Sequence, residues 1–141
     1  MKRTYPGRFG SAHGPKGRMR PATPLFYLHR LDLTRELFDV DMRLEGVGVY
    51  QQSSNAEKKP YMVISQEWVD AANESQPSPS EAEIAEFMTS LGFTLLEDSV
   101  FRWRRTRLGE SAVLVSDSKP DNFIKTRTGV VPIDLIVGYE N

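Results

Sequence analysis

The sequence predicts a small α+β fold with a mostly antiparallel sheet and two main helices. Several short runs rich in valine, isoleucine and aromatic residues are separated by polar turns, which is typical of antiparallel strands. Helical periodicity occurs in only two segments, residues 29–37 and 81–91. The chain has 141 residues, of which 39% are hydrophobic and 26% charged. This length and composition suit one domain with a single modest core.

The composition excludes several classes of function. The net charge of −1 gives no overall attraction to nucleic acid or to an anionic membrane. The chain has no cysteine, so it has no disulfide, no thiolate zinc site and no cysteine nucleophile. No apolar run approaches the ~18 residues of a membrane span. We therefore expect a soluble cytoplasmic protein with no membrane partner.

Residues 1–24 form a basic N-terminal arm, which we separate from a single domain at residues 25–141. No acidic residue occurs before Asp32, whereas the arm carries six cationic residues: Lys2, Arg3, Arg8, Lys16, Arg18 and Arg20. Few apolar groups are available for burial, which favours a flexible, solvated tail. The alternative is an arm that makes weak contacts with the phosphates of a nucleic acid. Neither His13 nor His29 has an acidic or cysteine residue nearby at the spacing of metal ligands, so a histidine metal site is not expected. Both are interpreted as surface residues.

The first half of the domain predicts a helix and a hairpin. Apolar residues recur with helical spacing over residues 29–37. Two strands, residues 42–52 and 60–71, are joined by the polar turn at 53–59 and are expected to pair antiparallel. Two glycines in the first of these strands, Gly46 and Gly48, are best explained by a bulged strand.

The second half predicts a capped helix and a series of short strands. Ser80 and Glu83 have capping-box spacing at the start of the helix at residues 81–91, and Gly92 ends it. Residues 101–107, "FRWRRTR", read as a half-buried strand whose arginines face outward, and single-stranded nucleic acid is the less favoured interpretation. The expected strands are residues 93–98, 100–107, 111–116, 122–126 and 130–137.

One carboxylate in this pattern requires an explanation. Asp134 lies in the apolar run "VVPIDLIV", and a desolvated carboxylate without a partner is costly. The turn "SDSKPDN" precedes it, and Asp117 and Asn122 can be explained there as turn formers. If the flanking strands are adjacent, however, both residues can converge with Asp134 at one end of the sheet. Two carboxylates and an amide oxygen are ligands that suit Mg²⁺ bound to phosphates.

The string "DSKPDN…G…ID" resembles the catalytic segment of protein-kinase-like phosphotransferases. The stretch from about Leu37 to Val137 further resembles the protein-kinase domain of polyvalent proteins from phages and mobile elements. The pieces that carry this resemblance are "MVISQEWV", "SEAEIAEFMTSLGF", "FRWRR" and "SDSKPDNFIKTRTGVVPIDLIV". They extend over roughly 100 residues, in keeping with a reduced or degenerate kinase-like core of the expected domain size.

The resemblance implies a role for each matching residue. Asp117 would orient or deprotonate the hydroxyl of the phosphoryl acceptor, and Lys119 would neutralise charge on the transferred group. Asn122 and Asp134 would hold Mg²⁺ between the phosphates of ATP. Gln66 would lie near the segment whose backbone holds the adenine. Mg²⁺ and ATP are thus the implied cofactors.

The chain also departs from the kinase pattern. Val115 and Ser116 stand where kinases have histidine and arginine, and Leu135 replaces the glycine that follows the metal-binding aspartate. Neither a glycine-rich phosphate loop nor an early lysine in an apolar strand is visible. Three interpretations stay open: an active phosphotransferase, a non-catalytic relative that binds a nucleotide or a protein partner, and an interaction domain without nucleotide. A homodimer could supply missing elements, and the third interpretation predicts Asp134 on an edge strand facing solvent.

Overall fold

The computed structural model describes residues 1–15, 18–99, 101–106 and 108–140. Within these residues the chain forms two α-helices and a set of short antiparallel strands. The expected α+β class is confirmed. No described helix has the length and apolar character needed to cross a membrane.

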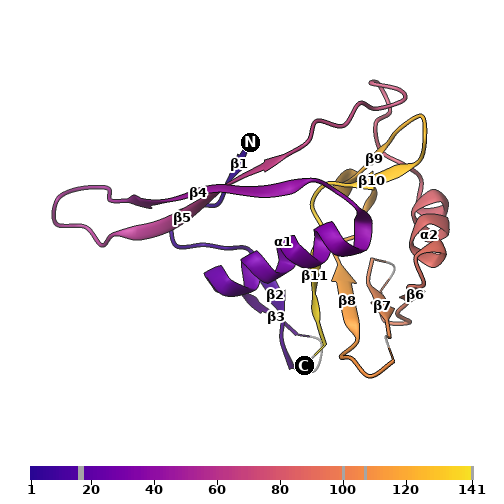
Figure 1. The fold of residues 1–141 in the computed structure, drawn as a ribbon, viewed down its shortest axis with the longest axis horizontal. Coiled ribbons are helices and arrows are strands. Elements are labelled where there is room, and N and C mark those ends of the chain that lie inside the picture. Colours follow the sequence, from indigo (N-terminus) through magenta and orange to yellow (C-terminus); the bar gives the residue numbers. More distant parts are fainter. Residues whose placement is uncertain (16–17, 100, 107, 141) are drawn as a thin grey trace.

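The first sheet contains three strands in the order β1-β5-β4, made by β1 (Lys2–Arg3), β4 (Met42–Tyr50) and β5 (Lys59–Gln66). The expected hairpin of β4 and β5 is confirmed, and its far end projects from the rest of the molecule (Figure 1). The register shifts between Leu44 and Gly46, which is the predicted bulge. The second strand ends at Gln66, whereas the sequence predicts that it continues to residue 71.

Helix α1 (Pro24–Phe38) is longer than the predicted segment 29–37. Thr23 caps it by accepting a hydrogen bond from the Phe26 N–H at 3.3 Å, and proline occupies the first turn, where no N–H is needed. Asp39 ends the helix in a left-handed conformation with φ 52°. The prediction missed the first turn of the helix because its start signals, Thr23 and Pro24, lie before the apolar periodicity begins.

Helix α2 (Glu81–Ser90) begins and ends within a residue of the prediction. Ser80 and Glu83 form the capping box in both directions. Gly92 follows in the left-handed region with φ 84°, a conformation that glycine adopts without steric cost. Ile84 and Met88 are buried on the inner face of the helix.

A second sheet has the order β11-β8-β7-β6, and a separate two-stranded sheet pairs β9 with β10. These strands are β6 (Thr94–Leu95), β7 (Trp103–Arg105), β8 (Val113–Ser116), β9 (Phe123–Lys125), β10 (Val130–Pro132) and β11 (Ile136–Tyr139). The single strand predicted at 130–137 is wrong, because β10 pairs with β9 and β11 pairs with β8. Asp134 therefore lies in the break between two strands, where no cross-strand neighbour desolvates it.

The N-terminal arm packs on the domain, which corrects the expectation of a solvated tail. Besides β1, it forms β2 (Ser11–His13) and β3 (Met19–Pro21), which pair with each other. Phe9, Ala12 and His13 are buried, and β2 packs against β11. In Figure 1 these strands lie beneath α1, beside the C-terminal strand. The arm thus covers one side of the sheet formed by β8 and β11.

The main core lies between α1, α2 and the second sheet. It is built from buried aliphatic and aromatic side chains, including Leu37, Met88, Trp103, Val115 and Phe123. In β7 the alternation is as predicted, with Trp103 buried and Arg104 exposed. This core fixes both ends of the segment 117–134, which carries most of the predicted site residues.

Candidate functional site

The loop after β8 has a strained start that is held by one hydrogen bond. Asp117 adopts a left-handed backbone with φ 59°, which is uncommon for a residue with a side chain. The Asn122 side-chain Nδ2 donates to the Asp117 carbonyl oxygen at 2.6 Å and stabilises this conformation. Asn122 is 8% exposed. The contact joins the Asn122 side chain to the Asp117 backbone and does not involve the Asp117 carboxylate.

The middle of the loop is fixed to the core. Ser118 is 1% exposed, and its hydroxyl accepts a hydrogen bond from the Trp103 indole at 3.0 Å. Its backbone N–H donates to the Phe101 carbonyl at 3.2 Å. Pro120 to Asn122 then form a 3₁₀ turn, closed by the Asn122 N–H on the Lys119 carbonyl. Asp117 is thus presented from a rigid loop, which suits a group that must be pre-positioned.

Lys119 lies beside Asp117 at the surface. Its Nζ is 3.7 Å from Asp117 Oδ1, and the two side chains are about half exposed. An exposed ion pair of this kind contributes little to stability. The lysine is therefore available to an anion that approaches Asp117.

Asp134 is brought near this loop by the β9–β10 hairpin. The Ile133 N–H donates to the Asn122 carbonyl at 2.9 Å, so the residue before Asp134 is bonded directly to the loop. Asp134 itself accepts a hydrogen bond on Oδ1 from Arg30 Nη2 at 3.0 Å, and its side chain is 60% exposed. It is therefore partly solvated and paired with a cation, which none of the three sequence-based interpretations predicts in full.

Asp117 and Asp134 border the same cavity, which has a volume of about 760 Å³. Most of the other residues that line it come from the N-terminal arm. Five cationic residues also line it: Lys2, Arg3, Arg8, Arg20 and Arg30. Five cations against two carboxylates make this cavity attractive to an anionic ligand such as a polyphosphate. We refer to it as the basic cavity.

A second cavity of about 500 Å³ begins where β5 ends. Its walls include residues 66–71 on one side and Ile124 and Ile133 on the other. Gln66 lies at its edge, with Nε2 donating to the Pro132 carbonyl at 3.3 Å. Its lining combines apolar side chains with the acidic residues Glu67, Asp70 and Glu74. We refer to this space as the hinge cavity.

Lys2 lines both cavities and connects them. Its Nζ donates to the Ile133 carbonyl at 2.8 Å, one residue before Asp134. The sequence offered no lysine in an early apolar strand, but β1 is a two-residue strand on the edge of the first sheet. A strand this short leaves no periodic signal, so Lys2 could not be identified from the pattern alone.

Two further residues near the site were not predicted. Arg30 comes from α1, 104 positions before its partner Asp134. His13 is 4% exposed, which corrects its interpretation as a surface residue, and its Nε2 lies 2.6 Å from the Ser116 hydroxyl. Burial, assisted by the charges of Arg102 and Arg30, lowers the pKa of His13 to about 4. The imidazole is therefore neutral at pH 7 and clamps the arm to the end of β8.

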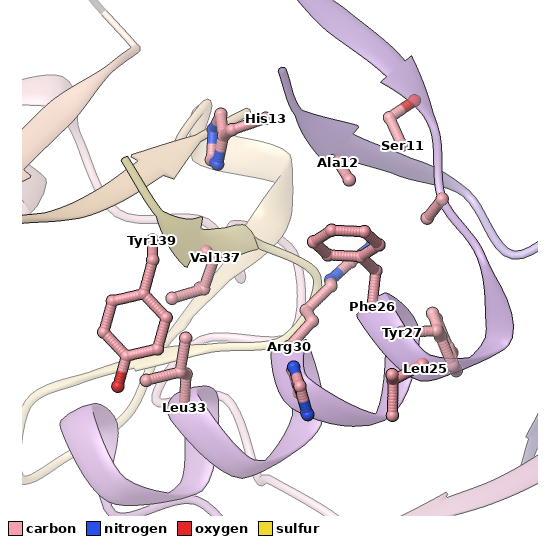
Figure 2. Close-up of a pocket in the computed structure, with 13 residues that line it drawn as sticks. Ser11, Ala12, His13, Leu25, Phe26, Tyr27, Arg30, Leu33, Val137 and Tyr139 are labelled. Atoms are coloured by element: carbon pink, nitrogen blue, oxygen red, sulfur yellow. The ribbon is translucent and has the colours of Figure 1, made fainter. Parts of the chain in front are cut away.

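His13 also borders a third, mostly apolar cavity of about 250 Å³. Figure 2 shows this space between the start of α1, the arm and β11, with Phe26 on one side and Val137 and Tyr139 on the other. Asp117, Asn122 and Asp134 are not among its lining residues. It is therefore separate from the predicted site, which it meets only through shared residues such as Arg30 and Tyr27.

The described residues do not by themselves provide a set of side chains for a metal ion. No group of three or more histidine, cysteine, aspartate or glutamate side chains able to hold a metal occurs in the described part of the chain. Asp134 has a second carboxylate oxygen beyond the one bonded to Arg30, whereas Asn122 is not among the residues that line the basic cavity. Mg²⁺ in nucleotide sites is commonly held by one or two such protein groups plus phosphate oxygens.

Comparison with known proteins adds no relative: the chain matches no family model, no curated protein and no solved structure.

Proposed function

We propose that the chain is a kinase-like domain that binds a Mg²⁺–nucleotide complex and supports phosphoryl transfer from it. The observation that carries this proposal is the shared basic cavity: a rigid loop presents Asp117, the β9–β10 hairpin returns Asp134 to the same space, and Lys2 leads from there into the hinge cavity. A nucleotide could then extend from one cavity to the other.

Each residue has a defined task in this proposal. Residues 66–71 would bind the base through their backbone, and Lys2 would contact the phosphates that pass between the cavities. Asn122 and Asp134 would hold Mg²⁺, which neutralises charge on the phosphates when bound.

Asp117 would accept the proton of an acceptor hydroxyl as that oxygen bonds to the terminal phosphorus and the nucleoside diphosphate leaves. Lys119, beside Asp117, would balance the charge of the transferred group. Positioning and charge neutralisation of this kind are the main contributions that proteins make to phosphoryl transfer.

The test is calorimetric titration of ATP with Mg²⁺ into the wild-type protein and into Asp134→Asn. We expect binding that requires Mg²⁺ and is weakened at least tenfold by the substitution, which keeps the shape of the side chain and removes its charge. Asp121→Asn is the matched control, since Asp121 lies in the neighbouring loop at 117–122, is exposed and lines neither cavity. Absence of binding to the wild type contradicts the proposal.

A second candidate function, protein binding without catalysis, is favoured by the projecting hairpin. Val47 and Val49 are 69% and 63% exposed there, and Leu44 and Tyr50 are also exposed. β4 is an edge strand, which can pair with a strand of another chain. Sedimentation of the wild type and of Val49→Lys tests for a homodimer formed in this way. A wild type that remains monomeric at high concentration contradicts the dimer.

A further inference from the structure

The N-terminal arm carries a local concentration of positive charge. Residues 1–24 contain six cationic residues and no acidic one, although the net charge of the chain is −1. Arg3, Arg8 and Arg20 line the basic cavity, and none of them forms an ion pair within the described residues. Arg3 and Arg20 instead lie over aromatic rings, 5.2 and 4.6 Å from the ring centres. Three guanidinium groups in one cavity wall are therefore available to an anionic ligand.

The basic cavity adjoins another cavity, of about 400 Å³, and Tyr5 and Arg8 line both. We refer to the smaller space as the tyrosine cavity, because Tyr50 and Lys59 complete its ring of aromatic and cationic side chains. Tyr5 is 80% exposed and Tyr50 is 48% exposed. Neither ring takes part in an aromatic or cation–π contact in the part of the chain that the structure describes. Two exposed tyrosines thus lie beside the cations.

Backbone hydrogen bonds hold this part of the arm against β5. The N–H groups of Thr4 and Gly7 donate to carbonyl oxygens of that strand at 3.0 and 2.8 Å. Tyr5 lies between these two bonds, and its own carbonyl accepts a hydrogen bond from the Arg8 N–H at 2.9 Å. The backbone that carries the ring and the guanidinium is therefore in place before a ligand arrives, which lowers the entropy cost of binding.

We propose that the basic cavity and the tyrosine cavity together form a binding surface for single-stranded nucleic acid. The cations contact the phosphates of the strand, and the exposed tyrosines stack on its bases, which is how proteins commonly hold a single strand. The combined lining has six cationic residues against three acidic ones, Asp117, Asp134 and Glu57. Two of these acids are already paired, Asp117 with Lys119 and Asp134 with Arg30. The surface is thus positive although the chain as a whole is not.

The exposed rings favour a single strand over a duplex. Bases in a duplex are stacked on one another, whereas those of a single strand are open to stacking on an aromatic side chain. This inference goes beyond the proposed function and does not rest on it, because Tyr5, Tyr50 and Lys59 have no task there and no metal is involved.

The test is the fluorescence anisotropy of a labelled thymidine oligonucleotide of about twelve nucleotides, titrated with the full chain at several salt concentrations without Mg²⁺ or ATP. The variants are Arg8→Gln, Arg18→Gln, Tyr5→Leu and Tyr5→Phe. Arg18→Gln is the matched control for charge, since Arg18 belongs to the same arm, is exposed and lines neither cavity. Tyr5→Phe keeps the aromatic ring that Tyr5→Leu removes. A uridine oligonucleotide shows whether RNA binds as well as DNA, and a duplex of the same length serves as the comparison.

We expect the wild type to bind the single strand more tightly than the duplex. Arg8→Gln should reduce the slope of log affinity against log salt by about 0.7, the contribution of one phosphate contact on a single strand, and Arg18→Gln should leave the slope unchanged. Tyr5→Leu should weaken binding about tenfold, whereas Tyr5→Phe should bind like the wild type. Binding of either the DNA or the RNA strand with this pattern supports the inference and identifies the sugar that is accepted.

Three results overturn the inference: no binding of either strand to the wild type, equal affinity for strand and duplex, or equal effects within each pair of variants. The outcome is separable from that of the proposed function. A wild type that binds the oligonucleotide but not Mg²⁺–ATP supports this inference and contradicts the proposed function, and the converse result overturns this inference alone.

Discussion

The left-handed backbone of Asp117 predicts that glycine and alanine at this position differ in stability, although both remove the carboxylate. At φ 59° a residue with a Cβ pays a steric cost of about 1–2 kcal/mol that glycine does not pay. The greater entropy of glycine in the unfolded chain offsets about 0.4–1 kcal/mol of this. Asp117→Gly should therefore be more stable than Asp117→Ala by about 0.5–1 kcal/mol, or about 2–4 °C in Tm for a domain of this size.

Thermal and urea unfolding, followed by circular dichroism, measure this difference directly. Asn122→Ala should lower the stability of the wild type by about 1–3 kcal/mol, because it removes the hydrogen bond that holds the Asp117 carbonyl. Both Asp117 variants should lose phosphoryl transfer equally, so the stability difference between them isolates the backbone effect. An alanine variant as stable as the glycine variant would refute the idea that the loop holds Asp117 in a strained conformation.

Three further predictions concern the residues around the site. Ser118→Ala should lower the free energy of unfolding by about 1–3 kcal/mol, because it leaves the buried Trp103 N–H without an acceptor. Urea unfolding followed by tryptophan fluorescence measures this loss, and a loss near zero contradicts the prediction. The lowered pKa of His13, about 4 against 6.5, means that the unfolded chain binds a proton first as pH falls. The stability due to neutral His13 should thus be complete above pH 6.5 and lost by pH 4, up to roughly 3 kcal/mol; His13→Gln should flatten this slope of stability against pH, and an unchanged slope contradicts the prediction. Lys2→Met should weaken Mg²⁺–ATP binding about tenfold in calorimetry while changing stability by less than about 0.5 kcal/mol; unchanged affinity removes Lys2 from the nucleotide site.

The elements that the sequence predicted well are those whose signals are local. The capping box of α2 involves residues three apart, and the hairpin of β4 and β5 joins neighbouring strands through one polar turn. The loop at 117–122 belongs to the same group, since the Asn122 side chain bonds to a carbonyl five positions earlier. Contacts over such short separations leave spacing patterns that one sequence can display.

The run 130–137 shows where such patterns stop being informative. An apolar segment of this length reads as one strand, because periodicity does not say which strand is its neighbour. In the structure the partner changes from β9 to β8 within the run, and residues 133–135 form the connection. Asp134 is tolerated because it falls in that connection, so the sequence correctly marked the residue as unusual and placed it in the wrong element.

The burial of the N-terminal arm could not be predicted either, because it depends on contacts with residues far away in the sequence. Its burial depends on contacts that join residues about a hundred positions apart, such as His13 with Ser116 and Lys2 with Ile133. A segment rich in arginine, glycine and proline has no periodicity from which these long-range contacts could be predicted. As a result, four of the five cations that line the basic cavity were assigned to a tail, and the positive charge of the cavity could not be derived from the motif alone.

The sequence left open whether Asp134 faces solvent or converges with Asp117 and Asn122 on a metal. In the structure this carboxylate is paired with Arg30. With one side chain 60% exposed, the pair contributes only about 0–1 kcal/mol to stability. It is therefore weak enough to be rearranged by a ligand, while the partly buried Arg30 side chain also contacts the Tyr27 ring. A carboxylate held in a strong, buried pair could not exchange its partner. The pair of Asp134 and Arg30 is exposed on the carboxylate side, so Asp134 is neither an isolated charge nor a fixed structural one, and a ligand that enters the basic cavity can displace its partner at little cost in stability.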